Sequence, residues 1–337
     1  MDALVWVLKA AVVVVLVAAV LAGVRHVRSA RQLRRLAAML DEGRHDEVLA
    51  HAPLAGPYER VADRLRSTSA LLTGRYDRTL DLLEGPHTAA DAVLAPTDVT
   101  ARAGSLLGMG RYAEAAAVLG DDPVEPLHRH LRAQVAVETG DDETARRLLA
   151  FPDADLELEA GRKRILGDLL IRRGQRDEGE ALVRQALAVY LASAIGACQV
   201  DAGYCHVHLA ESAIAQGRGD TALAHLQTAQ ALLEARPDNA PGFALLHLRR
   251  AEALALTGDA TAAAAALDSA TTLTATVPSR SLAAAVQHVR GVVAFRLGND
   301  HQAAEELRLA QRLHEALGEV RAAQAAAALL AELDHRQ

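Results

Sequence analysis

Apolar and polar positions along most of this chain repeat with the period of an amphipathic helix, and the helical stretches come in pairs separated by a glycine. Two examples are LLGMGRYAEAAAVL around Gly110 and FRLGNDHQAAEEL around Gly298. Glycine just past a helix permits the left-handed conformation that ends it, and Asp, Glu or Thr shortly afterwards can cap the next helix. The turn glycines recur at intervals of 30 to 43 residues and are Gly43, Gly74, Gly110, Gly140, Gly174, Gly217, Gly258 and Gly298.

The positions around each turn glycine carry the same kinds of side chain. The residue four places before it is apolar, and Leu or Val stands nine places after it in most units. The residue seven places before it is small in most units, which lets paired helices approach closely. This helix–turn–helix repetition predicts an all-α solenoid of about eight units. The small residues are Ser67, Ala103, Ala133, Gly167, Ala210, Ala251 and Gly291.

Proline and acidic residues mark the expected boundaries. Units one to four have short second helices, broken near Pro86, Pro123 and Pro152, whereas units five to eight have longer ones. The solenoid is expected to cover residues 30–318, with a capping helix and tail at 319–337.

The motif Gly110-Arg111-Tyr112-Ala113-Glu114-Ala115 resembles the G-x-Y-x-E-A turn of the tetratricopeptide repeat family. The longer C-terminal units, with Arg250-Ala251 and Arg290-Gly291 before the turn, resemble the tetratricopeptide-like repeats of large bacterial transcriptional regulators. The resemblance implies a concave face that binds a protein or peptide partner. The family's first-helix positions, carried over residue by residue, imply partner-binding side chains at Arg164, Asp168, Arg172, Tyr204, Val207, Glu211, Leu248, Glu252, His288, Val292 and Phe295.

The beginning of the chain has a different pattern. Residues 3–24 form an apolar run interrupted only by Lys9, and a basic helix is expected at 25–40. Such a run spans about 33 Å as a helix, enough to cross the hydrocarbon core of a bilayer. Arginines beside a span favour the cytoplasmic side and attract anionic lipid. The pattern predicts a single-pass anchor in a bacterial inner membrane, with the N-terminus outside, the solenoid in the cytoplasm and the flanking residues Arg25, Arg28, Arg31, Arg34 and Arg35.

A cleaved signal peptide is the alternative for the same segment. Lys9 would end its charged region, residues 10–21 would be its apolar region, and Val20-Leu21-Ala22 resembles a cleavage site. The protein would then be an exported periplasmic assembly factor. The arginines that follow oppose export, which favours the anchor.

Composition and charge limit the class of fold and the class of partner. Hydrophobic residues make up 51% of the chain and aromatic residues 3%, which suits closely packed helices. The net charge is −7 although residues 1–40 hold six basic residues and one acidic residue, so the remainder is acidic and nucleic acid is not an expected partner. Cys198 and Cys205 suit a reducing compartment, and on one helix they would lie about 10.5 Å apart, too far for a disulfide.

The sequence lacks the motifs of common catalytic sites. A P-loop needs Gly-Lys-Ser or Gly-Lys-Thr, and neither Lys9 nor Lys163 follows a glycine. H-E-x-x-H, G-x-S-x-G and C-x-x-C do not occur. We therefore expect neither enzymatic activity nor a cofactor.

The cluster most similar to a metal site is Cys198, Cys205, His206 and His208, with His225 nearby. Thiolate and imidazole suit zinc, and Cys205 and His208 can share a helix face. His206 and His208 point about 200° apart on a helix, so they cannot both be ligands. We expect these residues to pack in the core and predict no metal site.

Arginines recur one residue before the small position, where equivalent residues of a regular solenoid stack into a ladder. One interpretation is a basic stripe that grips an acidic peptide or a C-terminal carboxylate. The other is that each arginine pairs with a neighbouring carboxylate and covers apolar surface with its stem. These arginines are Arg35, Arg66, Arg102, Arg132, Arg250 and Arg290.

Together these features predict a membrane-anchored tetratricopeptide-type scaffold or adaptor that binds a protein or peptide partner at the cytoplasmic face. The other class left open is a regulatory sensor, in which the solenoid binds a small ligand or peptide and changes shape. A concave pocket with converging polar groups would favour the sensor.

Overall fold

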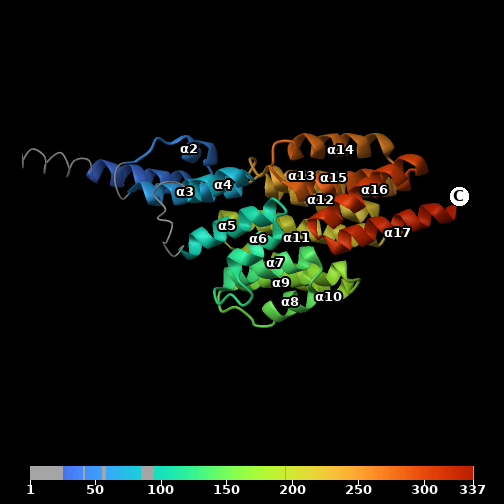
Figure 1. The fold of residues 1–337 in the computed structure, drawn as a ribbon, viewed down its shortest axis with the longest axis horizontal. Helices are drawn as coiled ribbons and strands as arrows, with labels where there is room; N and C mark the ends of the chain where they lie inside the picture. The colour runs from blue at the N-terminus through green and yellow to red at the C-terminus, as the bar shows by residue number, and fades with distance from the viewer. Residues whose placement is uncertain (1–25, 41, 55–57, 85–94, 194, 337) are drawn as a thin grey trace, which may run out of the picture. The chain divides into compact units, whose positions relative to one another are not determined.

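The computed structural model describes residues 26–40, 42–54, 58–84, 95–193 and 195–336. These residues form helices joined by turns and short connections, without a strand, which fits the expected α-solenoid (Figure 1). The expected anchor at residues 3–24 lies outside the described residues. Within them, no helix is long and apolar enough to cross a membrane.

The eight turn glycines each separate the two helices of one pair, which we number repeats 1 to 8. All eight have φ between 71° and 82°, so the predicted left-handed turns are confirmed. The pairs are 26–40 with α2 (His45–Ala50), α3 (Tyr58–Leu72) with α4 (Tyr76–Leu83), α5 (Pro96–Gly108) with α6 (Tyr112–Leu119), α7 (Pro126–Thr139) with α8 (Asp142–Leu148), α9 (Leu156–Arg172) with α10 (Arg176–Ala192), α11 (Gly196–Ala215) with α12 (Gly219–Leu233), α13 (Ala240–Thr257) with α14 (Ala260–Thr274), and α15 (Arg280–Arg296) with α16 (Asp300–Leu317); α17 (Val320–Arg336) follows.

The second helices differ in length between the two halves of the series, as the sequence predicts. They have 6 to 8 residues in repeats 1 to 4 and 15 to 18 residues in repeats 5 to 8. The extra turns bury one alanine each, and Ala186, Ala229, Ala270 and Ala310 are fully buried.

The small residue before each turn allows the close approach expected of it. Ala103, Ala133, Ala210 and Ala251 are fully buried. A Cβ added at Gly291 would lie 2.6 Å from Cγ of Leu307, so no larger residue fits there without movement.

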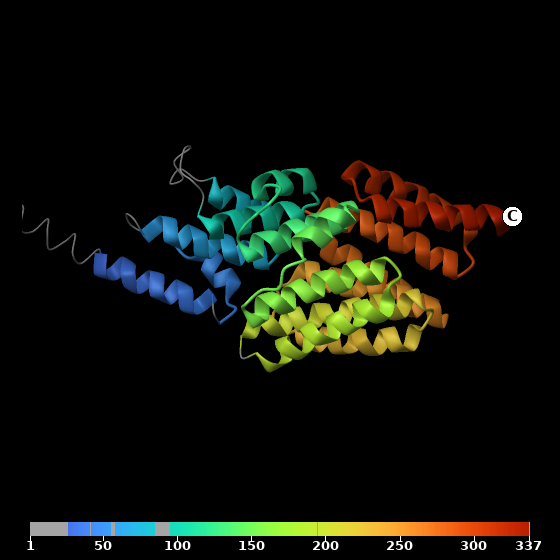
Figure 2. The same ribbon diagram turned by 90° about the horizontal axis from the view of Figure 1, so that it is seen from below.

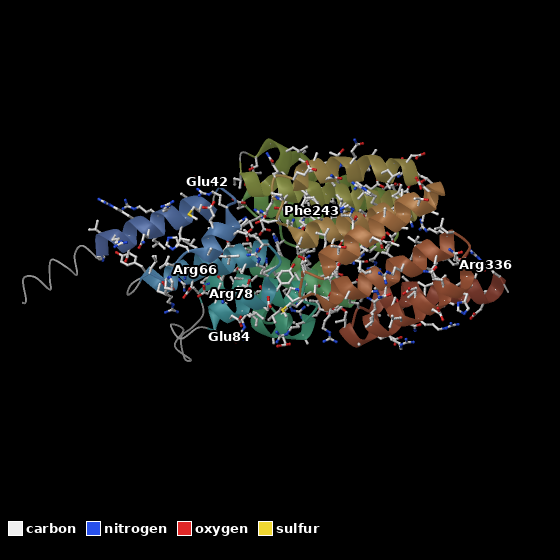
Figure 3. All side chains as sticks on the ribbon, turned by 90° about the horizontal axis from the view of Figure 1, so that it is seen from above. Glu42, Arg66, Arg78, Glu84, Phe243 and Arg336 are labelled. Carbon is white, nitrogen blue, oxygen red and sulfur yellow. The ribbon has the colours of Figure 1, made fainter. Side chains whose placement is uncertain are left out.

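The chain divides into two compact units. The N-terminal unit comprises residues 1–70 and 78–93, and the main unit comprises residues 71–77 and 94–337. In the N-terminal unit Arg66, labelled in Figure 3, is 4% exposed and its guanidinium lies 2.9 Å from Glu59 and 2.6 Å from Asp63. The apolar core of this unit contains Leu36, Met39, Val48, Leu54 and Ala62.

The first helices of the main unit form a closed circuit. Along the chain α7 contacts α9, α9 contacts α11, α11 contacts α13, α13 contacts α15 and α15 contacts α17, and α17 then returns to contact α7. Figures 1 and 2 show the same return of the C-terminal helices toward the middle of the chain. We call these helices, α7, α9, α11, α13, α15 and α17, the inner ring. The second helices pack against the first helices of their own and the next repeat.

Turns of early repeats in the main unit pack on the starts of later helices. A Cβ added at Gly74 would lie 2.5 Å from Cγ of Pro241, and one added at Gly110 would lie 3.2 Å from Cβ of Ser281. The amide of Arg280 donates to the carbonyl of Met109 at 3.2 Å. Within the main unit, residues 71–77 and the turns of repeats 3 and 4 therefore pack on the C-terminal helices.

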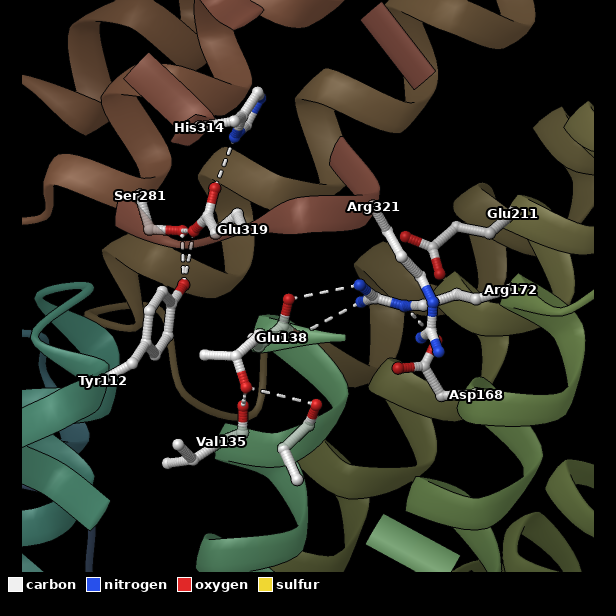
Figure 4. A network of polar contacts seen from close by, with 12 residues as sticks. Tyr112, Val135, Glu138, Asp168, Arg172, Glu211, Ser281, His314, Glu319 and Arg321 are labelled. Carbon is white, nitrogen blue, oxygen red and sulfur yellow. Dashed lines mark hydrogen bonds and ion pairs between the residues drawn. The ribbon is translucent and has the colours of Figure 1, made fainter. Parts of the chain in front are cut away.

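A buried polar cluster, which we call the latch, joins the same parts of the chain (Figure 4). The Tyr112 hydroxyl donates to Glu319 at 2.5 Å and lies 3.0 Å from Ser281 Oγ, while His314 bonds the other oxygen of Glu319. Tyr112, His314 and Glu319 are at most 5% exposed. Desolvation opposes ionisation of Glu319, but hydrogen bonds from His314, Ser281 and Tyr112 lower its pKa.

Candidate functional site

Every helix of the inner ring contributes a charged side chain to one region, which we call the ring network. Figure 4 shows several of them pointing toward one another from different helices. The contributors are Glu138 of α7, Asp168 and Arg172 of α9, His208 and Glu211 of α11, Arg249 and Glu252 of α13, Arg296 of α15 and Arg321 of α17.

Helical periodicity explains why these residues share a face. Asp168, Glu211 and Glu252 each stand six residues before the turn glycine of their repeat. His208 and Arg249 stand nine residues before theirs, three residues earlier on the same helix face. Equivalent positions of successive repeats therefore place carboxylates and cations side by side.

Arg172 joins two helices at one end of the network. Its terminal guanidinium nitrogens lie 3.1 and 3.3 Å from the two oxygens of Glu138, and its Nε donates to Asp168 at 3.0 Å. Burial raises the pKa of Glu138, and Arg172 opposes that rise. The paired geometry holds both carboxylates against one guanidinium.

His208 lies between two carboxylates at the centre of the network. Its Nδ1 is 3.2 Å from Asp168 and 3.2 Å from Glu211. Desolvation favours the neutral ring, but Asp168 and Glu211 outweigh it and raise the pKa of His208 to about 9. His208 is therefore an imidazolium at neutral pH and links α9 to α11.

Arg249 continues the chain of charges toward α15. Its Nε donates to Glu211 at 2.6 Å, and its NH1 lies 3.1 Å from Glu252. Desolvation opposes ionisation of Glu211, but Arg249 and His208 lower the pKa of this carboxyl to about 2. Arg296 bonds the Glu252 carbonyl at 3.4 Å. Opposite charges thus alternate from Glu138 to Arg296.

The network remains open to solvent at its ends. Side-chain exposure is 33% for Arg172, 26% for Glu138 and 24% for Arg249, against about 10% for His208. Arg321 reaches the region from α17 and pairs with Asp142. A ligand that entered the ring would meet the partly exposed guanidiniums of Arg172 and Arg249 and the Glu138 carboxylate around a buried imidazolium.

Four of the predicted partner-binding residues lie in this network: Asp168, Arg172, Glu211 and Glu252. Arg164 lies beside Asp201 and Tyr190 on neighbouring helices, and the Tyr204 hydroxyl accepts from Asn239 at 3.3 Å. These two side chains are partly buried and belong to other pairs.

The remaining predicted residues lie in the interior. Val207 and Leu248 are fully buried in core clusters, and Val292 is 6% exposed. Phe295 packs under the Arg336 guanidinium at 3.9 Å, and the His288 ring packs on His314. Burial lowers the pKa of His288 to about 4.

The sequence reasoning missed Glu138, His208, Arg249, Arg296 and Arg321. The available signal was a register difference of one residue. Val207 and Leu248 stand ten residues before their turn glycines and face the core, whereas the residues directly after them, His208 and Arg249, reach the ring.

The residues of the metal-like cluster point to different parts of the structure. Cys198 and Cys205 lie in one apolar core cluster, and burial raises the pKa of Cys205 to about 12. His206 packs on His225 with ring centroids 5.3 Å apart, while His208 points to the ring network. The opposite directions of His206 and His208 are those predicted from helical geometry.

Asp168, His208 and Glu211 nevertheless form a group whose ligand atoms lie within 4.8 Å of one another, compatible in number and type with a cation site. Arg172 and Arg249 already bond these two carboxylates. A bound cation would have to compete with both guanidiniums and with the His208 proton, so we assign the group as an ion-pair network.

Three of the arginines that precede the small position bond different side chains. Arg66 pairs with carboxylates of its own helix, Arg250 donates to Gln230 at 2.7 Å, and Arg290 donates to Thr271 at 3.2 Å. Arg66 thus pairs with carboxylates as the second interpretation expects, whereas Arg250 and Arg290 bond neutral side chains. Among the N-terminal arginines, Arg28, Arg31, Arg34 and Arg35 are exposed on helix 26–40, and Arg25 lies outside the described residues.

The geometry defines a class of protein: an all-helical chain of repeated helix pairs whose main unit closes into a ring with a charged interior. No family model matches the sequence, and a search of curated proteins finds no match.

Proposed function

We propose that this protein is a scaffold that binds a peptide or a segment of a partner protein along the inner ring. The observation that supports this proposal is the ring network, in which successive first helices place cations and carboxylates in alternation and leave Arg172, Glu138 and Arg249 partly exposed. A polypeptide carries both charges and backbone hydrogen-bonding groups, so it can replace internal ion pairs with its own. The resemblance of the turn motif to tetratricopeptide repeats supports the same proposal.

The second part of the proposal concerns location. The apolar run at residues 3–24 anchors the scaffold in the inner membrane, with the solenoid on the cytoplasmic side. Its support is the basic segment that follows the run, in which four arginines are exposed. Anchoring would raise the concentration of a bound partner near other membrane proteins.

Site-specific photocrosslinking tests the binding surface. A photoreactive residue at Ala215, exposed at the end of α11 and two residues before its turn glycine, occupies the position that Glu138 and Arg172 have in their repeats. The matched control replaces Ala265, which is exposed on the second helix α14. Protein adducts in native membranes should form from position 215 and not from 265. Equal labelling at both positions, or none at 215, would refute binding along the ring.

One observation favours the sensor as a second candidate. Two carboxylates lie 3.2 Å from His208, and each also accepts a hydrogen bond from a guanidinium. A small polar ligand could be bound by such a group. If the sensor interpretation holds, the crosslinking yields no protein adduct, while a metabolite extract protects the ring against thermal unfolding and fails to protect the Arg249→Gln variant.

A further inference from the structure

Exposed large apolar side chains gather at one edge of the main unit. In the described part of the chain, six of the nine such residues flank the starts of three consecutive first helices, α7, α9 and α11. Their exposure runs from 44% to 88%. We call this group the apolar edge: Val124, Leu127, Phe151, Leu156, Leu191 and Ile195.

Side-chain hydrogen bonds between the segments that carry these residues show that the group is continuous. Arg129 bonds the Val124 carbonyl at 3.4 Å and Asp153 at 2.5 Å, which brings the start of α7 beside the segment that carries Phe151. Ser193 donates to Glu157 at 3.2 Å, which brings the segment between Leu191 and Ile195 beside Leu156. The apolar side chains therefore follow one another across three repeats. Exposed patches of this kind mark interaction sites.

The same edge is covered elsewhere in the main unit. At the starts of α13, α15 and α17 the turns of repeats 2 to 4 pack against Pro241, Ser281 and Val320. The covering turns of repeats 2 and 3 carry Tyr76 and Tyr112, which are 8% and 5% exposed. The Tyr112 hydroxyl bonds Ser281 at the start of α15, so a helical element of the chain covers this edge where it is not exposed.

Charge indicates the chemistry of the occupant. The basic residues near the edge already have partners, since Arg129 pairs with Asp153, Arg147 with Asp122 and Arg162 with Glu159. Three carboxylates there, those of Glu125, Asp155 and Glu157, have no ion pair within the described residues. The apolar edge therefore has an uncompensated acidic border, which complements a basic partner.

A second copy of this chain is a poor fit. Its open turns, at Gly174, Gly217, Gly258 and Gly298, have nothing within 4 Å of an added Cβ. Where repeats 2 and 3 have tyrosine, two residues after the glycine, these turns have Arg176, Gly219, Ala260 and Asp300. They offer no apolar side chain equivalent to Tyr76 or Tyr112.

We propose that the apolar edge binds an amphipathic helix of a partner protein whose apolar face is bordered by Lys or Arg. This surface lies at the helix starts and is separate from the ring network, so it adds a second binding site to the scaffold. The side chains that anchor the helix are those of Phe151 and Leu156, while Glu125 and Glu157 attract its cations.

The test uses the full-length protein and two labelled helical peptides of about five turns, one of Leu and Lys and one of Leu and Glu. Fluorescence anisotropy should show binding of the Leu–Lys peptide and none of the Leu–Glu peptide. The double variant Phe151→Ser, Leu156→Ser should weaken binding by about tenfold or more, because it removes the central apolar anchors. Glu125→Gln with Glu157→Gln should weaken it by about two- to fivefold, with a smaller salt dependence.

The matched control is Val61→Ser, which removes an exposed apolar side chain of α3 in the N-terminal unit, outside the apolar edge, and should leave affinity unchanged. Equal binding of both peptides, or no loss in the Phe151→Ser, Leu156→Ser variant, would overturn the proposal. Light scattering on the same variants covers the other occupants. Self-association, or binding to anionic vesicles, that is lost in that double variant would assign the edge to a second copy or to a membrane instead.

Discussion

The turns of repeats 2 to 4 and those of repeats 5 to 8 contain the same glycine in the same left-handed conformation, but they have different roles. Gly74, Gly110 and Gly140 are covered by later helices, whereas the glycines of repeats 5 to 8 face open space. The covered turn at Gly140 packs on α17, where the ring closes, and the later repeats supply most of the charged interior of the ring. The same left-handed glycine turn therefore either packs on a later helix or faces solvent, and the residues around the glycine decide between these two environments.

A disulfide across the closing contact tests the comparison most strongly. Cβ of a residue at Gly140 would lie 3.5 Å from Cβ of Val320, within the range of disulfides. The variant Gly140→Cys, Val320→Cys should oxidise readily, and its oxidised form should exceed its own reduced form in unfolding free energy by about 4 kcal/mol. Denaturant unfolding with and without reductant measures this difference. Gly258→Cys with Val320→Cys is the control and should stay reduced; failure of the first pair to crosslink would contradict closure.

Removing the latch tyrosine should have the next largest effect. Tyr112→Ala leaves a cavity and takes a partner from Glu319 and Ser281, so we expect a loss of about 3–4 kcal/mol. Arg176→Ala, at the equivalent position of an open turn, should change stability by less than about 0.5 kcal/mol. Chemical denaturation of both variants checks the contrast, which disappears if the two losses are alike.

Alanine substitutions at a covered and an open turn glycine separate two costs to stability: the clash with a covering helix and the backbone strain of positive φ. Gly258→Ala should cost about 1 kcal/mol because alanine disfavours positive φ. Gly74→Ala should cost about 2 kcal/mol more, since its Cβ would lie 2.5 Å from Cγ of Pro241. Thermal melts of the pair measure the difference. A similar loss in both would show that the Gly74 turn is not covered in solution.

The pH dependence of the unfolding free energy tests the ring network of the later repeats, through the charge on His208. The pKa of His208 is raised from its ordinary value of about 6.5 to about 9. Its contribution is therefore complete below about pH 6.5 and is lost as the pH rises through about 9. Wild type should lose about 1–2 kcal/mol more than His208→Gln between pH 6.5 and 9.5. Parallel curves for the two proteins would mean that His208 is not held between carboxylates.

The candidate site was only partly predictable from the sequence. The acidic residues six places before the turn glycine, Asp168, Glu211 and Glu252, could be placed from the repeat pattern. His208 and Arg249 could not, because a register shift of one residue turns a side chain from the core to the inner face. Arg321 could not be predicted as a member of the site, because it belongs to the last helix and comes near Glu138 only where the ring closes.

The sequence by itself determined the helix pairs, their turn glycines, the short second helices of repeats 1 to 4 and the final helix. These features depend on contacts between residues a few positions apart, which amphipathic spacing and glycine express locally. Only the tertiary structure decided which turns are covered and which charges meet. Curvature accumulates from small rotations between repeats, so the contact of Tyr112 with Glu319, 207 residues apart, depends on every repeat between them.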